Sequence, residues 1–86
     1  MIDIMNLEIL TPEKKVFEGE VVSAIFPGAD GSFQVLKDHA PLVGLLRDGV
    51  VEYRLKDKSQ QQVTITGGVV EVLNNQVILL ADGLKA

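Results

Sequence analysis

Few residues in this chain are of a type that could carry chemistry. A serine hydrolase needs a serine, a histidine and an acid, and the chain offers Ser23 or Ser32 together with His39 and Asp38. Asp38 and His39 are adjacent, however, and adjacent side chains in an extended segment point to opposite faces. The sequence around the serines also lacks the nucleophile-elbow motif. We therefore expect that this chain is not an enzyme.

Metal and phosphate sites are disfavoured in the same way. One histidine and no cysteine cannot supply a multi-histidine or thiolate zinc site. Asp30-Gly31-Ser32 matches only a fragment of a calcium loop, and a polar turn is its ordinary interpretation. Gly67-Gly68 lacks the lysine of a phosphate loop, so we expect a bulge or a bend between strands there. The sequence predicts no metal and no cofactor.

Charge and hydropathy exclude further classes. The net charge is −4, from 12 acidic and 8 basic residues, and the basic residues do not cluster as nucleic-acid binding requires. No apolar run is long enough to span a membrane. The first ten residues carry Asp3 and Glu8 and no basic region, which predicts that they are not a signal peptide. The absence of cysteine fits a reducing compartment.

The elements that would position these residues are strands. Apolar and charged side chains alternate strictly over Val51–Lys56, as they do in a strand with one buried and one solvated face. Gln62–Thr66 and Leu7–Ile9 show the same period. Denser apolar runs at Val69–Val72 and Val77–Leu80 indicate more completely buried strands.

Turn residues separate these runs at short intervals. They are Thr11-Pro12, Pro27-Gly28, Asp30-Gly31, Asp48-Gly49, the polar stretch Lys56–Gln61 and Asn74-Asn75, the last typical of a tight hairpin. The segment His39–Leu46 is ambiguous, but Pro41 and Gly44 argue against a helix there. We predict an all-β fold, a flattened β-sandwich or barrel of about ten short, mostly antiparallel strands. Residues 1–86 are too few for a second core, so one domain is expected.

Seven stretches, taken in order, carry a resemblance to a known family. They are Leu7–Glu13, Val16–Gly19, Pro27–Phe33, His39–Leu42, Gly67–Val72, Asn75–Val77 and Leu80–Asp82. Together they resemble the amino-terminal domain of the epsilon subunit of F-type ATP synthases, called delta in mitochondria. The resemblance spans nearly the whole chain with matching gaps, and His39-Ala40-Pro41-Leu42 is its most recognisable part.

This resemblance implies a flattened β-sandwich and a non-catalytic rotor subunit of the central stalk, which couples proton or sodium flow to ATP synthesis. It implies a peripheral location on the cytoplasmic face of the bacterial inner membrane, as part of the whole ATP synthase. The implied partners are the gamma subunit and the polar loops of the c ring. Asp30, Gly31 and Ser32 correspond to the part that faces the ring. The gamma contact corresponds to His39, Ala40, Pro41, Leu42 and Gly44.

Simpler interpretations remain open at two of these residues. His39 either contacts gamma or makes hydrogen bonds within its own sandwich. Gly31 either lies where a backbone approaches the ring or serves only as a turn residue.

The chain also departs from the family in two places. Gln34 stands where the family usually has glycine, which permits backbone angles that glutamine resists. The sequence ends at Ala86, whereas many members continue into a two-helix hairpin, so inhibition of ATP hydrolysis and ATP binding are not carried over. A naturally short form and a trimmed one are both compatible with this end, and the Gly83–Ala86 ending favours the natural form.

The alternative function is a free-standing β-sandwich that binds a peptide or a carbohydrate. A carbohydrate site requires exposed aromatic side chains on one face. The chain has only Phe17, Phe26, Phe33 and Tyr53, mostly at positions that alternation assigns to the core.

Overall fold

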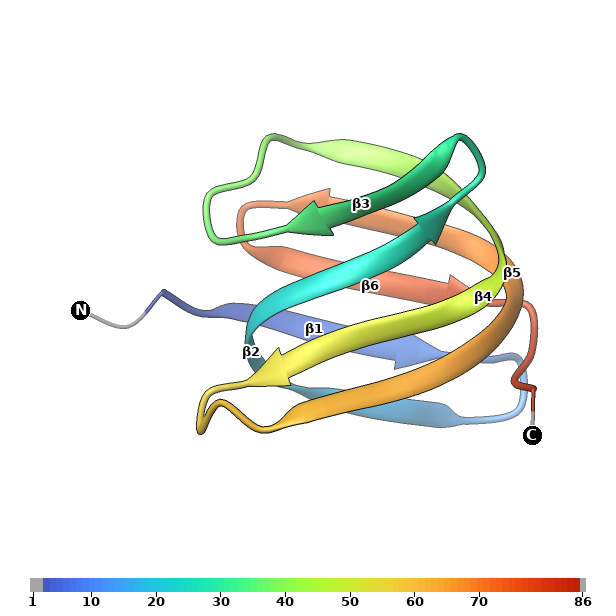
Figure 1. The fold of residues 1–86 in the computed structure, drawn as a ribbon, viewed down its shortest axis with the longest axis horizontal. Helices are drawn as coiled ribbons and strands as arrows, with labels where there is room; N and C mark the ends of the chain where they lie inside the picture. Colours follow the sequence, from blue (N-terminus) through green and yellow to red (C-terminus); the bar gives the residue numbers. More distant parts are fainter. Residues whose placement is uncertain (1–2, 86) are drawn as a thin grey trace.

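The computed structural model describes residues 3–85 and is built from β-strands alone (Figure 1). The six strands are β1 Met5–Leu10, β2 Lys15–Gly28, β3 Gly31–Val35, β4 Leu42–Leu55, β5 Gln60–Leu73 and β6 Gln76–Ala81. The predicted all-β class is confirmed. Within residues 3–85, no helix is long and apolar enough to cross a membrane.

Five of the strands close on themselves. The hydrogen-bonded order is β1-β6-β5-β4-β2-β3, and β1 also pairs with β2. The additional β1–β2 pairing completes a barrel of β1, β6, β5, β4 and β2, with β3 added along β2. All pairings are antiparallel except β1 with β6, which is parallel. The short strand β3 is therefore the edge of the sheet.

The predicted number of strands was too high, because three strands are long and bend. β2, β4 and β5 each have 14 residues, and each pairs with different neighbours along its length. Asp48-Gly49, predicted to open a strand, pairs instead with Thr66 and Ile65 inside β4. Pro27-Gly28, predicted as part of a loop, forms the end of β2. Turn-forming residues thus mark bends within continuous strands.

The core follows the predicted alternation. In β1 the side chains of Met5, Leu7 and Ile9 are buried, and in β4 those of Val51 and Tyr53 are buried. Every buried side chain within residues 3–85 is hydrophobic, with Tyr53 counted among them. The remaining core side chains are Val21, Ala24, Phe26, Val35, Leu46, Ile65, Val70, Val72, Val77, Leu79 and Ala81. The alternating sequence therefore sorts side chains onto an inner and an outer face, as a sandwich requires.

The four aromatic side chains belong to this core. Phe26 is fully buried and lies 5.7 Å from Phe33 between ring centroids, while Phe17 and Tyr53 lie 4.6 Å apart. Phe17 and Phe33 are half-buried and pack against the core cluster. The aromatic residues thus fill the interior and do not form the outward-facing platform that a carbohydrate site needs.

The two sequence predictions about turns have different outcomes, and only the one for Asn74-Asn75 is confirmed. Asn74 and Asn75 form the two-residue turn between β5 and β6, with φ of 50° and 62°. Positive φ at both central residues is the geometry of a type I′ hairpin turn, which asparagine tolerates. Gly67 and Gly68, predicted to form a bulge or a bend between strands, lie instead inside the continuous strand β5, with φ of 83° and 152°. Gln34 is an ordinary member of β3 opposite Ile25, so replacing the family's glycine leaves a regular strand.

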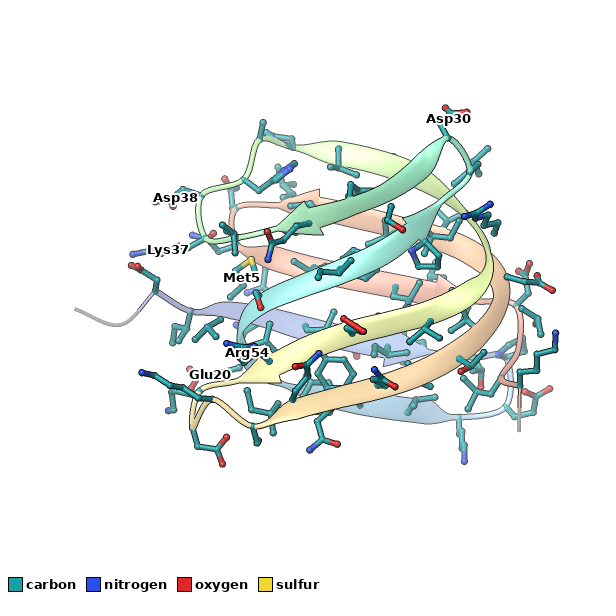
Figure 2. All side chains as sticks on the ribbon, viewed as in Figure 1. Met5, Glu20, Asp30, Lys37, Asp38 and Arg54 are labelled. Atoms are coloured by element: carbon teal, nitrogen blue, oxygen red, sulfur yellow. The ribbon has the colours of Figure 1, made fainter. Side chains whose placement is uncertain are left out.

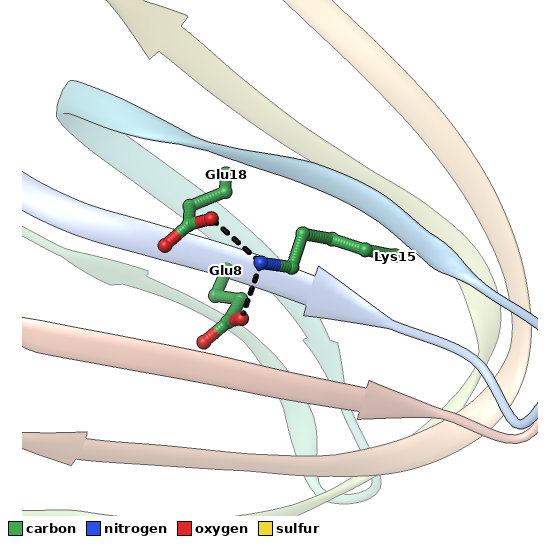
Figure 3. A network of polar contacts seen from close by, with 3 residues as sticks. All are labelled: Glu8, Lys15 and Glu18. Atoms are coloured by element: carbon green, nitrogen blue, oxygen red, sulfur yellow. Dashed lines mark hydrogen bonds and ion pairs between the residues drawn. The ribbon is translucent and has the colours of Figure 1, made fainter.

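A polar network on the surface joins the first two strands (Figure 3). Lys15 Nζ lies 2.7 Å from Glu18 Oε1 and 3.3 Å from Glu8 Oε2, and both carboxylates are exposed or partly exposed. The hydrogen bond to Glu18, then that to Glu8, raises the pKa of Lys15 above its usual value. Exposed pairs of this kind contribute little to stability, so the network serves mainly to fix side-chain positions at the β1–β2 turn.

Candidate functional site

The two predicted partner-binding segments lie at opposite ends of β3. Asp30 belongs to the turn that precedes β3, and Asp38 belongs to the loop that follows it, as Figure 2 shows. A five-residue strand separates them, which corresponds to about 17 Å at 3.4 Å per residue. One rigid strand thus holds two separate surfaces, and the predicted residues do not converge on a single site.

The first surface is the turn between β2 and β3. Asp30, Gly31 and Ser32 are exposed, and the Ala29 amide donates to the Leu45 carbonyl at 2.9 Å. Gly31 has a φ of 131° and open space around the position of a side chain. The turn is therefore tied to β4 by its base, while its tip presents a carboxylate and a hydroxyl to solvent.

The second surface begins with the loop between β3 and β4. The His39 amide donates to the Leu36 carbonyl at 3.1 Å, and His39 Nδ1 donates to the Ala40 carbonyl at 2.7 Å. Asp38 is bonded to Asn75 rather than to His39. His39 is half-buried and Ala40 is exposed. The histidine thus braces its own loop, and the acid next to it has a different partner.

Leu42 and Gly44 contribute less to the surface than the sequence predicts. Leu42 is partly buried against the core. A Cβ on Gly44 would lie 3.5 Å from both Phe33 Cζ and Val70 Cγ1, so this position faces the interior. Pro41 and Ala40 remain exposed. Any contact that this segment makes with a partner must therefore come from residues that alternate with Leu42 and Gly44 along β4 and face outward.

Those residues are Val43 and Leu45, which the sequence analysis did not single out. Their side chains are 71% and 69% exposed, the highest values among the large apolar residues of residues 3–85. Leu45 pairs with Val69 on β5, and Val69 pairs with Leu80 on β6, which is 53% exposed. Val43 also shares a shallow hollow with Leu73, which is 53% exposed.

We call Val43, Leu45, Leu73 and Leu80 the apolar face. It lies on the outer side of three adjacent strands, and the exposed Glu71 lies opposite Val43 within it. Exposed apolar side chains gathered in one place are typical of a protein interface. The signal in the sequence was the unbroken run Leu42-Val43-Gly44-Leu45-Leu46, which is too apolar for a strand with a solvated outer face.

Displaced pKa values elsewhere have ordinary structural causes. The hydrogen bond to Glu20 raises the pKa of Lys56, and burial raises that of Tyr53. The Ser59 hydroxyl, which donates to Asp57 at 2.6 Å in the β4–β5 loop, lowers the pKa of Asp57. Within residues 3–85 no group of three or more His, Cys, Asp or Glu residues is placed to hold a metal ion.

The position of Gly44 leads to a first prediction. Gly44→Ala should leave stability unchanged or raise the free energy of unfolding by about 0.5 kcal/mol, because the added methyl meets its neighbours at ordinary contact distances and removes freedom from the unfolded chain. Urea denaturation measures this. A loss greater than about 1 kcal/mol would mean that the space beside Phe33 is closed.

Comparison with known proteins identifies a family. The family model described as "ATP synthase, Delta/Epsilon chain, beta-sandwich domain" matches residues 4–85. A relative from Chlorobium limicola, named "ATP synthase epsilon chain", is 50% identical over 80 residues. That match covers 93% of this chain and 91% of the relative.

Solved structures show the same fold at low sequence identity. A chain in the Euglena gracilis mitochondrial ATP synthase, from a structure of OSCP/F1/c-ring in rotational state 1, has a TM-score of 0.85 at 20% identity. A chain in the central stalk/c-ring of the Tetrahymena thermophila mitochondrial ATP synthase has a TM-score of 0.80 at 17% identity. Each match covers 94% of this chain, but only 51% and 65% of the respective solved chains.

Proposed function

This chain belongs to the ATP synthase delta/epsilon family of β-sandwich domains, and from this premise we propose that it is a non-catalytic rotor subunit that binds gamma and contacts the c ring. In this role residues 1–86 act as one unit in the central stalk, of which the structure describes residues 3–85. The subunit couples ion translocation to ATP synthesis as a peripheral component on the cytoplasmic face of a bacterial inner membrane.

The observation that carries the gamma contact is the apolar face. Val43 and Leu45 are among the most exposed apolar side chains of the described chain, and they follow directly after His39, Ala40 and Pro41. Covering a side chain of this size is worth about 1.5–3 kcal/mol. The loop supplies a polar rim and the face supplies the apolar centre, an arrangement typical of stable interfaces.

The ring contact is assigned to the turn Asp30-Gly31-Ser32. It lies at the other end of β3 from the His39 loop, so the two partners do not compete for one surface. The turn is exposed and polar, and a carboxylate at its tip is suited to basic or hydrogen-bonding loops. Gly31 allows a close approach because nothing occupies the space beside it.

The direct test of the function is recovery of the complex. A tagged copy of the chain, expressed in its own host and solubilised with mild detergent, should recover gamma together with alpha, beta and c subunits. A Ser32→Cys variant, alkylated at the new thiol with a maleimide that carries a photoreactive group, should cross-link on illumination to the c-ring loops but not to alpha or beta. Recovery of the tagged chain alone, at native levels of expression, would contradict the proposal.

A second prediction concerns His39. His39→Ala should weaken binding to isolated gamma by about fivefold, which is roughly 1 kcal/mol, because the brace from Nδ1 to the Ala40 carbonyl is lost. Thermal unfolding of the free chain should be unchanged, since that hydrogen bond lies within an exposed loop. Calorimetric titration with gamma and a melting curve separate the two effects. A lower melting temperature with no change in affinity for gamma would assign His39 to the fold alone.

A further inference from the structure

Three of the four non-glycine residues that have left-handed backbone within residues 3–85 lie in two neighbouring turns. They are Asp38, Asn74 and Asn75, with φ of 65°, 50° and 62°. Left-handed backbone is uncommon outside glycine and best tolerated by Asn and Asp. The loop after β3 and the β5–β6 turn line a common hollow, although Asp38 and Asn75 are 37 positions apart in sequence. Two strained turns are thus held against each other.

A reciprocal pair of hydrogen bonds joins them. The Asp38 amide donates to Asn75 Oδ1 at 2.7 Å, and Asn75 Nδ2 donates to Asp38 Oδ1 at 3.1 Å. The Asn75 carbonyl also accepts from the Asn6 amide at 2.9 Å. Asn75 therefore connects the β5–β6 turn to the start of β1 and to the loop that begins the gamma-facing surface. One of its hydrogen bonds ends on a carboxylate, which strengthens it.

Few other contacts hold that loop to the rest of the protein. The recorded hydrogen bonds of His39 both stay within residues 36–40. Pairing with β5 resumes only at Leu42, opposite Val72. The ion pair from Lys37 to Asp3 is long, at 3.9 Å, and its acid is exposed. Thus the Asp38–Asn75 pair fixes the loop at one end and β5 fixes it at the other.

We propose that Asn75 is a positioning residue for the gamma-binding surface: through Asp38 it holds the His39–Pro41 loop in the conformation that gamma recognises. This inference rests on the proposed function for its partner, but the order of the loop in the free protein does not depend on gamma. A loop that is already ordered loses less conformational entropy on binding. Loosening the loop therefore lowers the affinity without removing any contact with the partner.

Exchanging the two side-chain types tests the proposal. Asn75→Asp places a second carboxylate opposite Asp38 and removes the Nδ2 donor. Its affinity for gamma should fall about tenfold, which corresponds to roughly 1.4 kcal/mol. In the double variant Asp38→Asn/Asn75→Asp, a donor and a carboxylate face each other again with their positions reversed. Its affinity should return to within about threefold of the original.

The matched control is Asn74→Asp. Asn74 lies in the same turn, has the same left-handed backbone, and undergoes the same change of charge, but no recorded hydrogen bond joins its side chain to Asp38 within residues 3–85. Its affinity for gamma should stay within about twofold of the original. Equal losses for Asn74→Asp and Asn75→Asp, or no rescue by the double variant, would overturn the proposal.

A second readout needs no partner. Amide hydrogen exchange at His39, whose amide donates to the Leu36 carbonyl at 3.1 Å, should accelerate about tenfold in the free chain of Asn75→Asp and recover in the double variant. If the original chain does not bind gamma at all, the proposed function fails while this measurement still tests the positioning. Unchanged exchange in Asn75→Asp would overturn the positioning role even if gamma binds normally.

Discussion

Val43→Asp is expected to reduce the affinity for gamma by at least about 100-fold, roughly 2.8 kcal/mol. Val43 is 71% exposed in the free protein and lies next to Leu45 and Leu73 on the apolar face. Losing the burial of a valine costs about 1.5–3 kcal/mol, and a carboxylate without a partner in a closed interface adds to that loss. Calorimetric titration of purified gamma with each chain measures the change directly.

Val50→Asp is the matched control for this prediction. Val50 lies on the same strand, is also apolar and is 43% exposed, but it pairs with Thr64 in the other half of β4, away from the apolar face. Its affinity for gamma should remain within about twofold of the original. Neither substitution should unfold the chain, because both side chains point outward. Similar affinities of the two variants for gamma would show that the apolar face is not part of the gamma interface.

Gly68→Ala should cost about 3 kcal/mol of stability, the largest effect expected from a single methyl in this chain. Gly68 has a φ of 152°, which is strained for any residue with a side chain and costs about 1–3 kcal/mol. A Cβ there would also collide with the Leu80 carbonyl and lie 3.0 Å from Ala81 Cα, both of them backbone atoms of β6. The melting temperature should fall by about 12–24 °C.

Gly31→Ala separates these two causes. Gly31 has a similarly strained φ of 131°, but nothing lies within 4 Å of the position of its Cβ. Its substitution should therefore show the backbone cost alone, about 1–2 kcal/mol. Urea denaturation measures both losses of stability. Equal losses in the two variants would show that the close contact of β6 with Gly68 adds nothing to the destabilisation by Gly68→Ala.

Local rules account for much of this fold. Alternation over Val51–Lys56 predicted which side chains of β4 enter the core, because one face of the strand is buried and the other is exposed to solvent. The Asn74-Asn75 turn followed from the backbone preferences of asparagine. Both are properties of short segments and need no knowledge of distant residues.

Strand continuity was harder to predict. Asp48-Gly49 has the composition of a turn, and only the partner strand β5 shows that pairing continues across it. The same applies to Pro27-Gly28, where β3 folds back on the end of β2. A propensity describes what a segment tolerates, whereas pairing across the sheet decides what it adopts.

The proposed binding surfaces likewise combine features that the sequence predicts with features that it does not. The His39 segment was found from a sequence motif, but the motif could not tell that Gly44 faces inward while Val43 and Leu45 face outward. The contact between Asp38 and Asn75 had no local signal at all, because its two residues meet only after the sheet has closed. Where a segment such as Leu42–Leu46 has no alternating pattern, side-chain direction comes from tertiary structure, and so do non-local hydrogen bonds.

The closure of the barrel by β1 has a consequence for folding during synthesis on the ribosome. β1 can pair early with β2, since Leu10 and Lys15 lie close in the chain, but its other edge pairs Leu10 with Leu80, 70 positions later. Ribosomes add about 5–20 residues per second, so this edge waits roughly 4–14 s for β6. During that interval Leu7 and Ile9, fully buried in the finished protein, lack their pairing with Val77 and Leu79 of β6. Nascent chains stalled before β6 should therefore bind chaperones, and release of the last strand should set the pace of folding.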